Sequence, residues 1–379
     1  MTDRSKLRRR LQLFTLLLPF TLGVSLAAEK RDVVTAENVG MSTERLARLS
    51  AAFDGYVARG ELAGAVVLVM RRGEVVFHQA FGERDREQKD AMETSDIFRI
   101  ASQTKALVST AILMLEEHGK LLISHPVSRY LPSFKGTTVA EDRDDGRYEI
   151  VPAKREITLR DLLTHTAGVS YGNGPTGHLW EKAEIQGWYF AHRDEPVRAT
   201  IDRMAALPFD AHPGEQWNYG YSTDILGAVV EAASGVPLDE FLRTRIFEPL
   251  GMSDTHFYLP SNKEDRLAAV YSATETRLAL APDPGNMVGQ GHYVNGPRRS
   301  FSGGAGLLSS AHDYSRFLEM MRRGGALDGQ RLLSRKTVEL MTTNHVGDKY
   351  ARERGLGFGL GFRVVLDHAE GRKGHGFAA

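Results

Sequence analysis

The sequence predicts an α/β (α+β) fold: an antiparallel sheet built from N- and C-terminal strands, flanked by helices, with a mostly helical domain inserted. Two β-branched runs between residues 64 and 82 indicate strands near the start of the chain. A glycine-rich segment that turns β-branched over residues 355–367 indicates a strand near its end. Apolar residues recur at helical spacing through much of the intervening region. Strands at both ends therefore favour one sheet that the two ends complete together.

The domain boundaries follow from this order of elements. The chain has 379 residues, enough for two or three domains or for one large domain that carries an insertion. We predict a sheet domain formed by residues 29–120 and 300–379, and a mostly helical inserted domain over residues 121–299. Residues 1–28 form a separate unit.

Each element has a local signal in the sequence. Residues 41–60 carry apolar side chains at helical spacing and predict a helix that ends at Gly60. The two β-branched runs meet at Arg-Arg-Gly-Glu, residues 71–74, which predicts a hairpin. In the segment ITLRDLLTHTAG, Thr158 is the expected helix cap and Gly168 the expected end. Further helices are predicted over residues 101–119, 221–235, 237–251, 311–325 and 334–344.

The first 28 residues have the pattern of a secretory signal peptide. A basic stretch, MTDRSKLRRR, precedes an apolar stretch that Gln12, Pro19 and Ser25 interrupt, and small residues suited to cleavage follow at Ala27 and Ala28. The apolar run is too short and too interrupted to favour a stable membrane anchor. We therefore expect an exported protein, periplasmic or secreted after cleavage.

Charge, cysteine and histidine content narrow the possible functions. Cleavage after residue 27 removes five positive charges and one negative charge, so the formal net charge changes from +0 to −4. A mildly acidic chain without a basic run argues against nucleic acid as a partner. The chain has no cysteine, which excludes thiol nucleophiles and disulfides. Its 13 histidines are scattered, so we expect no metal and no organic cofactor, and we interpret His165 as a packing residue.

Ser102 and Lys105 are the first candidate catalytic pair. They lie three residues apart at the start of a predicted helix that is apolar on nearly every side, so their side chains can touch. Burial disfavours an ammonium group, which would make the lysine a base able to activate the serine. The first turn also offers N–H groups to an oxyanion. About one Ser-x-x-Lys is expected by chance in a chain of this composition. A capping serine beside a solvated lysine is therefore an alternative interpretation of these two residues.

Two tyrosines form a second candidate feature. Tyr219 and Tyr221 lie in a tight turn before a predicted helix, in the segment PGEQWNYGYSTDILG. A tyrosine at such a place can bring its phenol to the end of another helix and pass a proton. Two packing tyrosines are the alternative.

A competing nucleophile pattern surrounds Ser170. The segment GVSYG, residues 168–172, matches Gly-x-Ser-x-Gly. A nucleophile elbow needs a buried strand before the serine and a helix after it. Here the preceding segment is predicted to be helical, and GNGPTG cannot form a helix. We therefore interpret Ser170 as a residue without a catalytic role.

Together these motifs resemble the serine β-lactamase-like superfamily, which includes class C β-lactamases, D-alanyl-D-alanine peptidases and family VIII carboxylesterases. FRIASQTK resembles its Ser-x-x-Lys motif, and LRDLLTHTAGV and PGEQWNYGYSTDILG resemble its helical domain and tyrosine motif. SGGAGLLSSAHDYSRFLEMM and LLSRKTVELMTTNH resemble the segments that lead to its last strands. The resemblance runs from about residue 40 to residue 379 and implies a β-lactamase/transpeptidase-like fold.

The resemblance implies roles for the candidate residues. Ser102 would be acylated, Lys105 would activate it, and Tyr219 would relay the proton, with either Lys105 or Tyr219 as the base for acylation. The backbone amides of Ser102 and Ala378 would form the oxyanion hole.

The substrate pocket follows from the family's third motif, Lys-Thr-Gly or Trp-Gly-Gly. Its only counterpart is KGHGFAA, in which His375, Gly376 and Phe377 would replace Trp-Gly-Gly. These three residues and Tyr221 would line the pocket.

The resemblance implies an exported serine hydrolase that cleaves small esters through a Ser102 acyl-enzyme. The Tyr-x-Tyr-Ser form and the DILG that follows it are closer to the esterase branch than to dedicated β-lactamases. The alternative with the same fold is a β-lactamase or a peptidase or amidase acting on D-amino-acid substrates. Relatives continue through further strands and a C-terminal helix, so the resemblance also implies a C-terminal truncation that impairs activity. A catalytically silent fragment or binding module is therefore a further alternative.

Overall fold

The computed structural model describes most of the chain after residue 34. The described residues are 35–143, 147–185, 187, 189–274, 277–285, 289–350, 354–368 and 370. The predicted signal peptide, residues 1–28, and the predicted third motif, which contains residues 375–378, lie outside them. Within the described residues no helix is long and apolar enough to cross a bilayer.

An antiparallel hairpin forms the N-terminal sheet, as predicted. β1 (Gly64–Arg71) pairs with β2 (Glu74–Asp85), and β2 also pairs with the short β3 (Asp90–Ala91). The chain turns between β1 and β2 at Arg72 and Gly73, both of which have positive φ. This backbone conformation matches the right-handed twist of paired strands.

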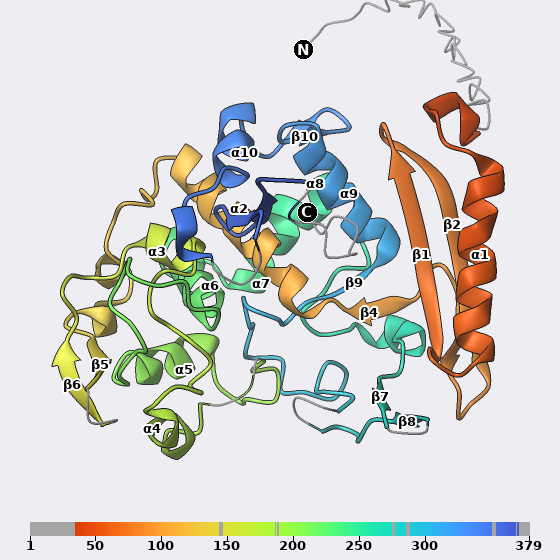
Figure 1. The fold of residues 1–379 in the computed structure, drawn as a ribbon. Helices are drawn as coiled ribbons and strands as arrows, with labels where there is room; N and C mark the ends of the chain where they lie inside the picture. Colours follow the sequence, from red (N-terminus) through yellow and green to blue (C-terminus); the bar gives the residue numbers. More distant parts are fainter. Residues whose placement is uncertain are drawn as a thin grey trace, which may run out of the picture.

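Two helices cover this sheet from opposite sides (Figure 1). α1 (Thr43–Ala58), which confirms the first predicted helix, packs on β2, and α9 (Ala311–Arg322) packs on β1. The side chain of Ser42 caps α1 by accepting a hydrogen bond from a backbone N–H of the first turn. The sheet therefore lies between a helix from the beginning of the chain and a helix from near its end.

The C-terminal strands differ from the prediction. The sequence predicts one strand over residues 355–367 in the same sheet as β1. The structure instead has a hairpin of two short strands, β12 (Leu356–Phe358) and β13 (Arg363–Val365), and among the described residues neither pairs with β1. The chain reverses at Gly361, where φ is 86°, so the glycine-rich sequence makes a turn inside the expected strand. The two halves of the chain are joined instead by pairing of β4 (Ile97–Arg99) with β9 (Leu308–Ser310).

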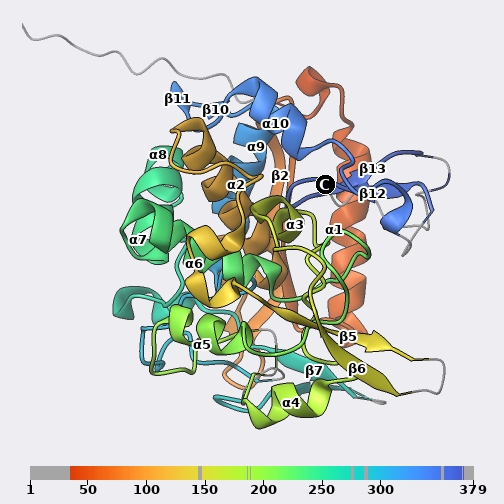
Figure 2. The same ribbon diagram turned by 90° about the vertical axis from the view of Figure 1, so that its left-hand side faces the viewer.

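α2 (Thr104–Glu117) is the central helix of the core. All of its residues from Thr104 to Leu115 are buried, as expected for a helix that is apolar on nearly every side. It packs against α6 (Ser222–Ser234) and α7 (Leu238–Leu242), and both helices lie next to it in Figure 2. β4 and a 3₁₀ turn, Ala101–Gln103, lead directly into α2. The turn Ala101–Gln103 is therefore held between the strand β4 on one side and the buried helix α2 on the other.

The remaining elements are short. The other helices are α3 (Leu159–Leu163), α4 (Gly177–Lys182), α5 (Val197–Met204), α8 (Glu248–Leu250) and α10 (Arg335–Met341). Three hairpins pair β5 (Thr138–Asp142) with β6 (Tyr148–Pro152), β7 (Tyr271–Ala273) with β8 (Leu278–Leu280), and β10 (Ala326–Leu327) with β11 (Gln330–Arg331). One apolar cluster extends across both predicted domain boundaries, and a division at residues 120 and 300 stays a prediction.

Candidate active site

The structure places Ser102 beside Lys105. Ser102 is exposed in the 3₁₀ turn, whereas Lys105 lies in the first turn of α2 and is only 5% exposed. The Nζ atom of Lys105 lies 3.3 Å from Oγ of Ser102, within hydrogen-bond distance. Ala101, just before the serine, has a φ of 44°, a left-handed conformation that costs a non-glycine residue about 1–3 kcal/mol. The backbone is therefore strained where it presents the candidate nucleophile.

Lys105 has two further hydrogen-bond partners from distant parts of the chain. Its Nζ lies 2.8 Å from the carbonyl oxygen of Gly304 and 3.3 Å from Oη of Tyr171. A carbonyl oxygen can only accept, so one Nζ hydrogen points at Gly304, whereas the hydroxyls of Tyr171 and Ser102 can each donate or accept. The ammonium form can donate to all three groups, and the neutral amine can direct its lone pair at Ser102. The geometry therefore suits a base that takes a proton from the serine.

Two tyrosines enclose the other side of Lys105. The ring of Tyr219, the predicted proton relay, has its centroid 4.7 Å from Nζ, and the hydroxyl of Tyr171 contacts Nζ directly. Burial raises the pKa of Tyr171, and the neighbouring Tyr219 and Asp224 raise it further. Tyr171 is therefore a neutral phenol that can donate a proton. Its role was not predicted, although its position next to Ser170 in the glycine-flanked GVSYG segment is a usable signal.

Close backbone contacts bring the two tyrosine loops together. A Cβ on Gly168 would lie 1.9 Å from the carbonyl oxygen of Ala211, and a Cβ on Gly220 would lie 2.3 Å from the carbonyl carbon of Ser170. Only glycine fits at either position, because such distances are shorter than any real Cβ contact. The loop of Tyr171 therefore lies directly on the loop of Tyr219.

α3 ends earlier than predicted. Thr158 caps the helix as expected, and it forms a capping box with Asp161. The helix ends at Leu163, and His165, with a φ of 57°, takes the left-handed conformation that was expected of Gly168. Gly168 is also left-handed, with a φ of 79°, but it lies beyond the end of the helix and serves the contact between loops.

His165 and Ser170 are both buried, which supports their interpretation as residues without a catalytic role. His165 is 1% exposed, its ring packs 4.8 Å from that of Tyr219, and its carbonyl oxygen accepts a hydrogen bond from the N–H of Asn218. Ser170 is buried and its Oγ accepts from the N–H of Gly172 at 3.1 Å. No strand precedes Ser170 in the described segment between α3 and α4, so the elbow geometry is absent there.

Tyr221 packs against Tyr171. It is fully buried, its hydroxyl donates to the carbonyl oxygen of Gly187, and its ring centroid lies 4.9 Å from that of Tyr171 in an edge-to-face contact. Tyr221 therefore supports Tyr171, and its place in a substrate pocket stays a prediction. His375, Gly376, Phe377 and Ala378 lie outside the described residues, so their predicted roles are not tested.

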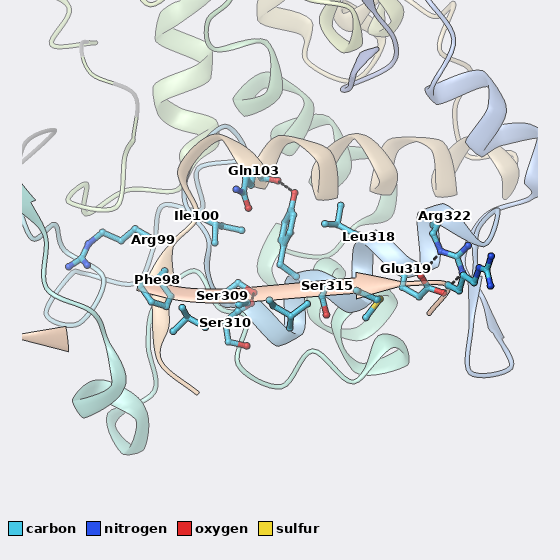
Figure 3. Close-up of a pocket in the computed structure, with 16 residues that line it drawn as sticks. Phe98, Arg99, Ile100, Gln103, Ser309, Ser310, Ser315, Leu318, Glu319 and Arg322 are labelled. Carbon is cyan, nitrogen blue, oxygen red and sulfur yellow. Dashed lines mark hydrogen bonds and ion pairs between the residues drawn. The ribbon is translucent and has the colours of Figure 1, made fainter. Parts of the chain in front are cut away.

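A cavity of about 580 Å³ opens beside the residue that follows Ser102 (Figure 3). Gln103 lines one part of it, and its carbonyl oxygen accepts a hydrogen bond from Oη of Tyr314. The ion pair between Glu319 and Arg322 lines another part. Ser102 and Lys105 are not among the lining residues, so the catalytic assignment rests on the hydrogen bonds around Lys105. Among the described residues no group of three or more His, Asp or Glu side chains could hold a metal ion.

Tyr171→Phe and Tyr219→Phe are each expected to lower kcat by about 10²-fold, the lower range for proton transfer by a positioned side chain. Because the two hydroxyls form one hydrogen-bonded pair, kcat of the double variant should fall little further than kcat of the more impaired single variant. Ester hydrolysis rates measure this, with Tyr258→Phe as control, since the hydroxyl of Tyr258 bonds to the backbone of Ala191 and Ser300 instead. Fully additive losses would show that the two hydroxyls act separately.

Comparison with known proteins identifies the family. The family model described as beta-lactamase matches residues 49–377. The chain is 34% identical to esterase EstB of Burkholderia gladioli over 340 residues, which cover 85% of this chain and 80% of EstB. It is 30% identical to lovastatin esterase of Penicillium rubens over 349 residues, covering 84% of this chain and 83% of that esterase.

Solved structures agree on the fold. EstCE1, described as a hydrolase with promiscuous acyltransferase activity, superposes with a TM-score of 0.74 at 28% identity. The superposition covers 86% of this chain and 84% of EstCE1. A family match over most of the chain, the shared β-lactamase/transpeptidase-like fold and the serine–lysine contact lead to one conclusion: this chain belongs to the beta-lactamase family of serine hydrolases.

Proposed function

We propose that this protein is a carboxylesterase that cleaves small esters through a Ser102 acyl-enzyme. The observation that carries the proposal is the position of the Lys105 Nζ, which contacts both Oγ of Ser102 and Oη of Tyr171. This contact supplies a nucleophile, a base and a proton-bearing phenol without histidine. The esterase names of two relatives that are about one-third identical support an ester as substrate.

Acylation begins with proton transfer from Ser102 to the neutral amine of Lys105. Oγ then forms a bond to the ester carbonyl carbon, and the carbonyl oxygen becomes an oxyanion. The backbone N–H of Ser102, beside the first turn of α2, is one proposed donor to that oxyanion, and the amide of Ala378 is the second.

Release of the alcohol needs the proton to reach the leaving oxygen. As the carbon–oxygen bond of the ester breaks, the alkoxide takes the proton from Lys105 through the paired hydroxyls of Tyr171 and Tyr219. In the second half of the reaction a water molecule gives a proton to the same groups and attacks the acyl carbon. Ser102 regains its proton as the acid leaves. Tyr171 suits this relay because its raised pKa keeps it protonated between steps.

A β-lactamase or D-amino-acid amidase of the same fold is the second candidate, because these activities share the acyl-enzyme chemistry. Hydrolysis of a short p-nitrophenyl ester and of a chromogenic cephalosporin separates the candidates. We expect the ester to be turned over with the higher kcat/KM. Turnover of the cephalosporin alone would contradict the esterase proposal while leaving Ser102 as nucleophile.

A further inference from the structure

Asp224 is a fully buried carboxylate close to the Lys105 site. It lies in the first turn of α6 and is 0% exposed. Its Oδ1 accepts hydrogen bonds from Oγ of Ser302 at 2.6 Å and from the N–H of Gly304 at 3.0 Å. Within the described part of the chain, Oδ2 has no hydrogen-bond partner. Burying a carboxylate costs several kcal/mol, so this group needs a compensating positive charge nearby.

Gly304 connects Asp224 to Lys105. Its N–H donates to Asp224, and its carbonyl oxygen accepts from the Lys105 Nζ at 2.8 Å, the shortest of the three hydrogen bonds of that amine. A Cβ on Gly304 would lie 2.2 Å from Oδ2 of Asp224, and one on Gly303 would lie 2.6 Å from the carbonyl oxygen of Thr223. The glycines therefore allow this loop to lie directly on α6. Asp224 therefore binds the N–H of Gly304, and the carbonyl oxygen of the same residue binds Lys105.

The charges around Lys105 also involve Asp224. Burial raises the pKa of Asp224 above its usual range, and the hydrogen bond from Ser302 and the positive charge of Lys105 offset only part of that rise. The negative charge of Asp224 in turn raises the pKa of Tyr171 and Tyr221, after the larger effect of burial.

Among the described residues, the other groups that contact Lys105 are hydroxyl groups and a carbonyl oxygen. They are the hydroxyl of Ser102, the phenols of Tyr171 and Tyr219, and the Gly304 carbonyl. Asp224 is therefore a carboxyl group whose negative charge acts on Lys105 and on the phenol of Tyr171.

We propose that Asp224 is a positioning residue of the reaction: through Gly304 it holds Lys105 against Ser102, and its charge sets the pH at which Lys105 can accept the serine proton. This inference rests on the proposed function, because it concerns the base of that reaction. Asp224 does not touch the substrate. Its effect should therefore appear in kcat and in the pH profile and not in KM.

Asp224→Asn tests the charge and largely keeps the shape. The amide oxygen can still accept from Ser302 and Gly304, but the negative charge is lost. An ammonium group is less stable without that charge, so the free amine exists at lower pH. The acid limb of the kcat/KM profile should move to lower pH by about one unit, the lower range for a nearby opposite charge. Asp224→Ala also removes the hydrogen bonds and should lower kcat about 10-fold or more, with KM within about twofold.

Asp313→Asn is the matched control. Asp313 is 2% exposed and accepts hydrogen bonds from the N–H of Asp254 and from Oγ1 of Thr255, so it anchors a different loop from a similarly buried position. Its variant should lose stability in thermal unfolding and keep the wild-type acid limb. The inference is overturned if the acid limb of Asp224→Asn coincides with that of the wild type, or if Asp313→Asn moves it equally. A wild-type protein that neither hydrolyses esters nor becomes acylated at Ser102 would contradict the proposed function itself.

Discussion

Ser102→Ala is expected to abolish ester hydrolysis, lowering kcat by about 10⁴- to 10⁶-fold, the range seen when a nucleophile is removed from a hydrolase. The loss should be this large because Oγ of Ser102 contacts the Lys105 amine and is the atom that we propose forms the bond to the acyl group. Ser102 is exposed, so its replacement by alanine should leave the unfolding temperature nearly unchanged. A collapse in activity without a collapse in stability is therefore the expected result.

Intact-mass measurement after treatment with a fluorophosphonate gives an independent check of the same residue. The wild type should gain one adduct, and Ser102→Ala should gain none. Ser170→Ala is the control: it should keep the adduct, because Ser170 is buried and bonded to the backbone of its own loop. An adduct that disappears in Ser170→Ala would restore the elbow interpretation. A folded wild-type protein that takes no adduct would instead support the catalytically silent alternative.

Lys105→Met is expected to have the second largest effect, lowering kcat by about 10³- to 10⁴-fold through loss of the base. It should also destabilise the fold by about 1–3 kcal/mol, because it leaves the buried carbonyl oxygen of Gly304 without its hydrogen-bond donor. Lys105→Arg separates these two effects. A guanidinium keeps the positive charge and N–H donors but cannot lose its proton, so this variant should be more stable than Lys105→Met and equally inactive.

Ester hydrolysis measures kcat of the two lysine variants, and denaturant unfolding measures their stability. Lys154→Met is the control, since Lys154 is exposed and pairs with Glu215 at the surface, where removal of a charge changes stability by less than about 1 kcal/mol. Appreciable activity in Lys105→Arg would exclude the lysine as the proton acceptor. The base would then have to come from the tyrosine pair.

Elements with a complete local signal could be predicted from the sequence. α1, the β1–β2 hairpin and α6 each combine the right periodicity with a cap or a turn, and each formed where expected. The predictions were wrong where a glycine that suggested a local structure is instead required by a contact with a distant residue. Gly168 was predicted to end a helix, yet glycine is required there because the carbonyl oxygen of Ala211 leaves no room for a Cβ atom. Gly361 reads as part of a strand, yet it turns the chain and donates a hydrogen bond to the carbonyl of Leu163.

The candidate catalytic pair could be predicted from the sequence. Ser102 and Lys105 are three residues apart at the mouth of a helix buried on all sides, and helical geometry alone places them in contact. The partners of that pair were decided by the tertiary structure. Tyr171 is 66 residues from Lys105 and Gly304 is 199 residues away, and no periodicity connects positions so distant. They meet at Lys105 because glycine backbones let one loop lie on another and on α6, a contact that exists only once the core has formed.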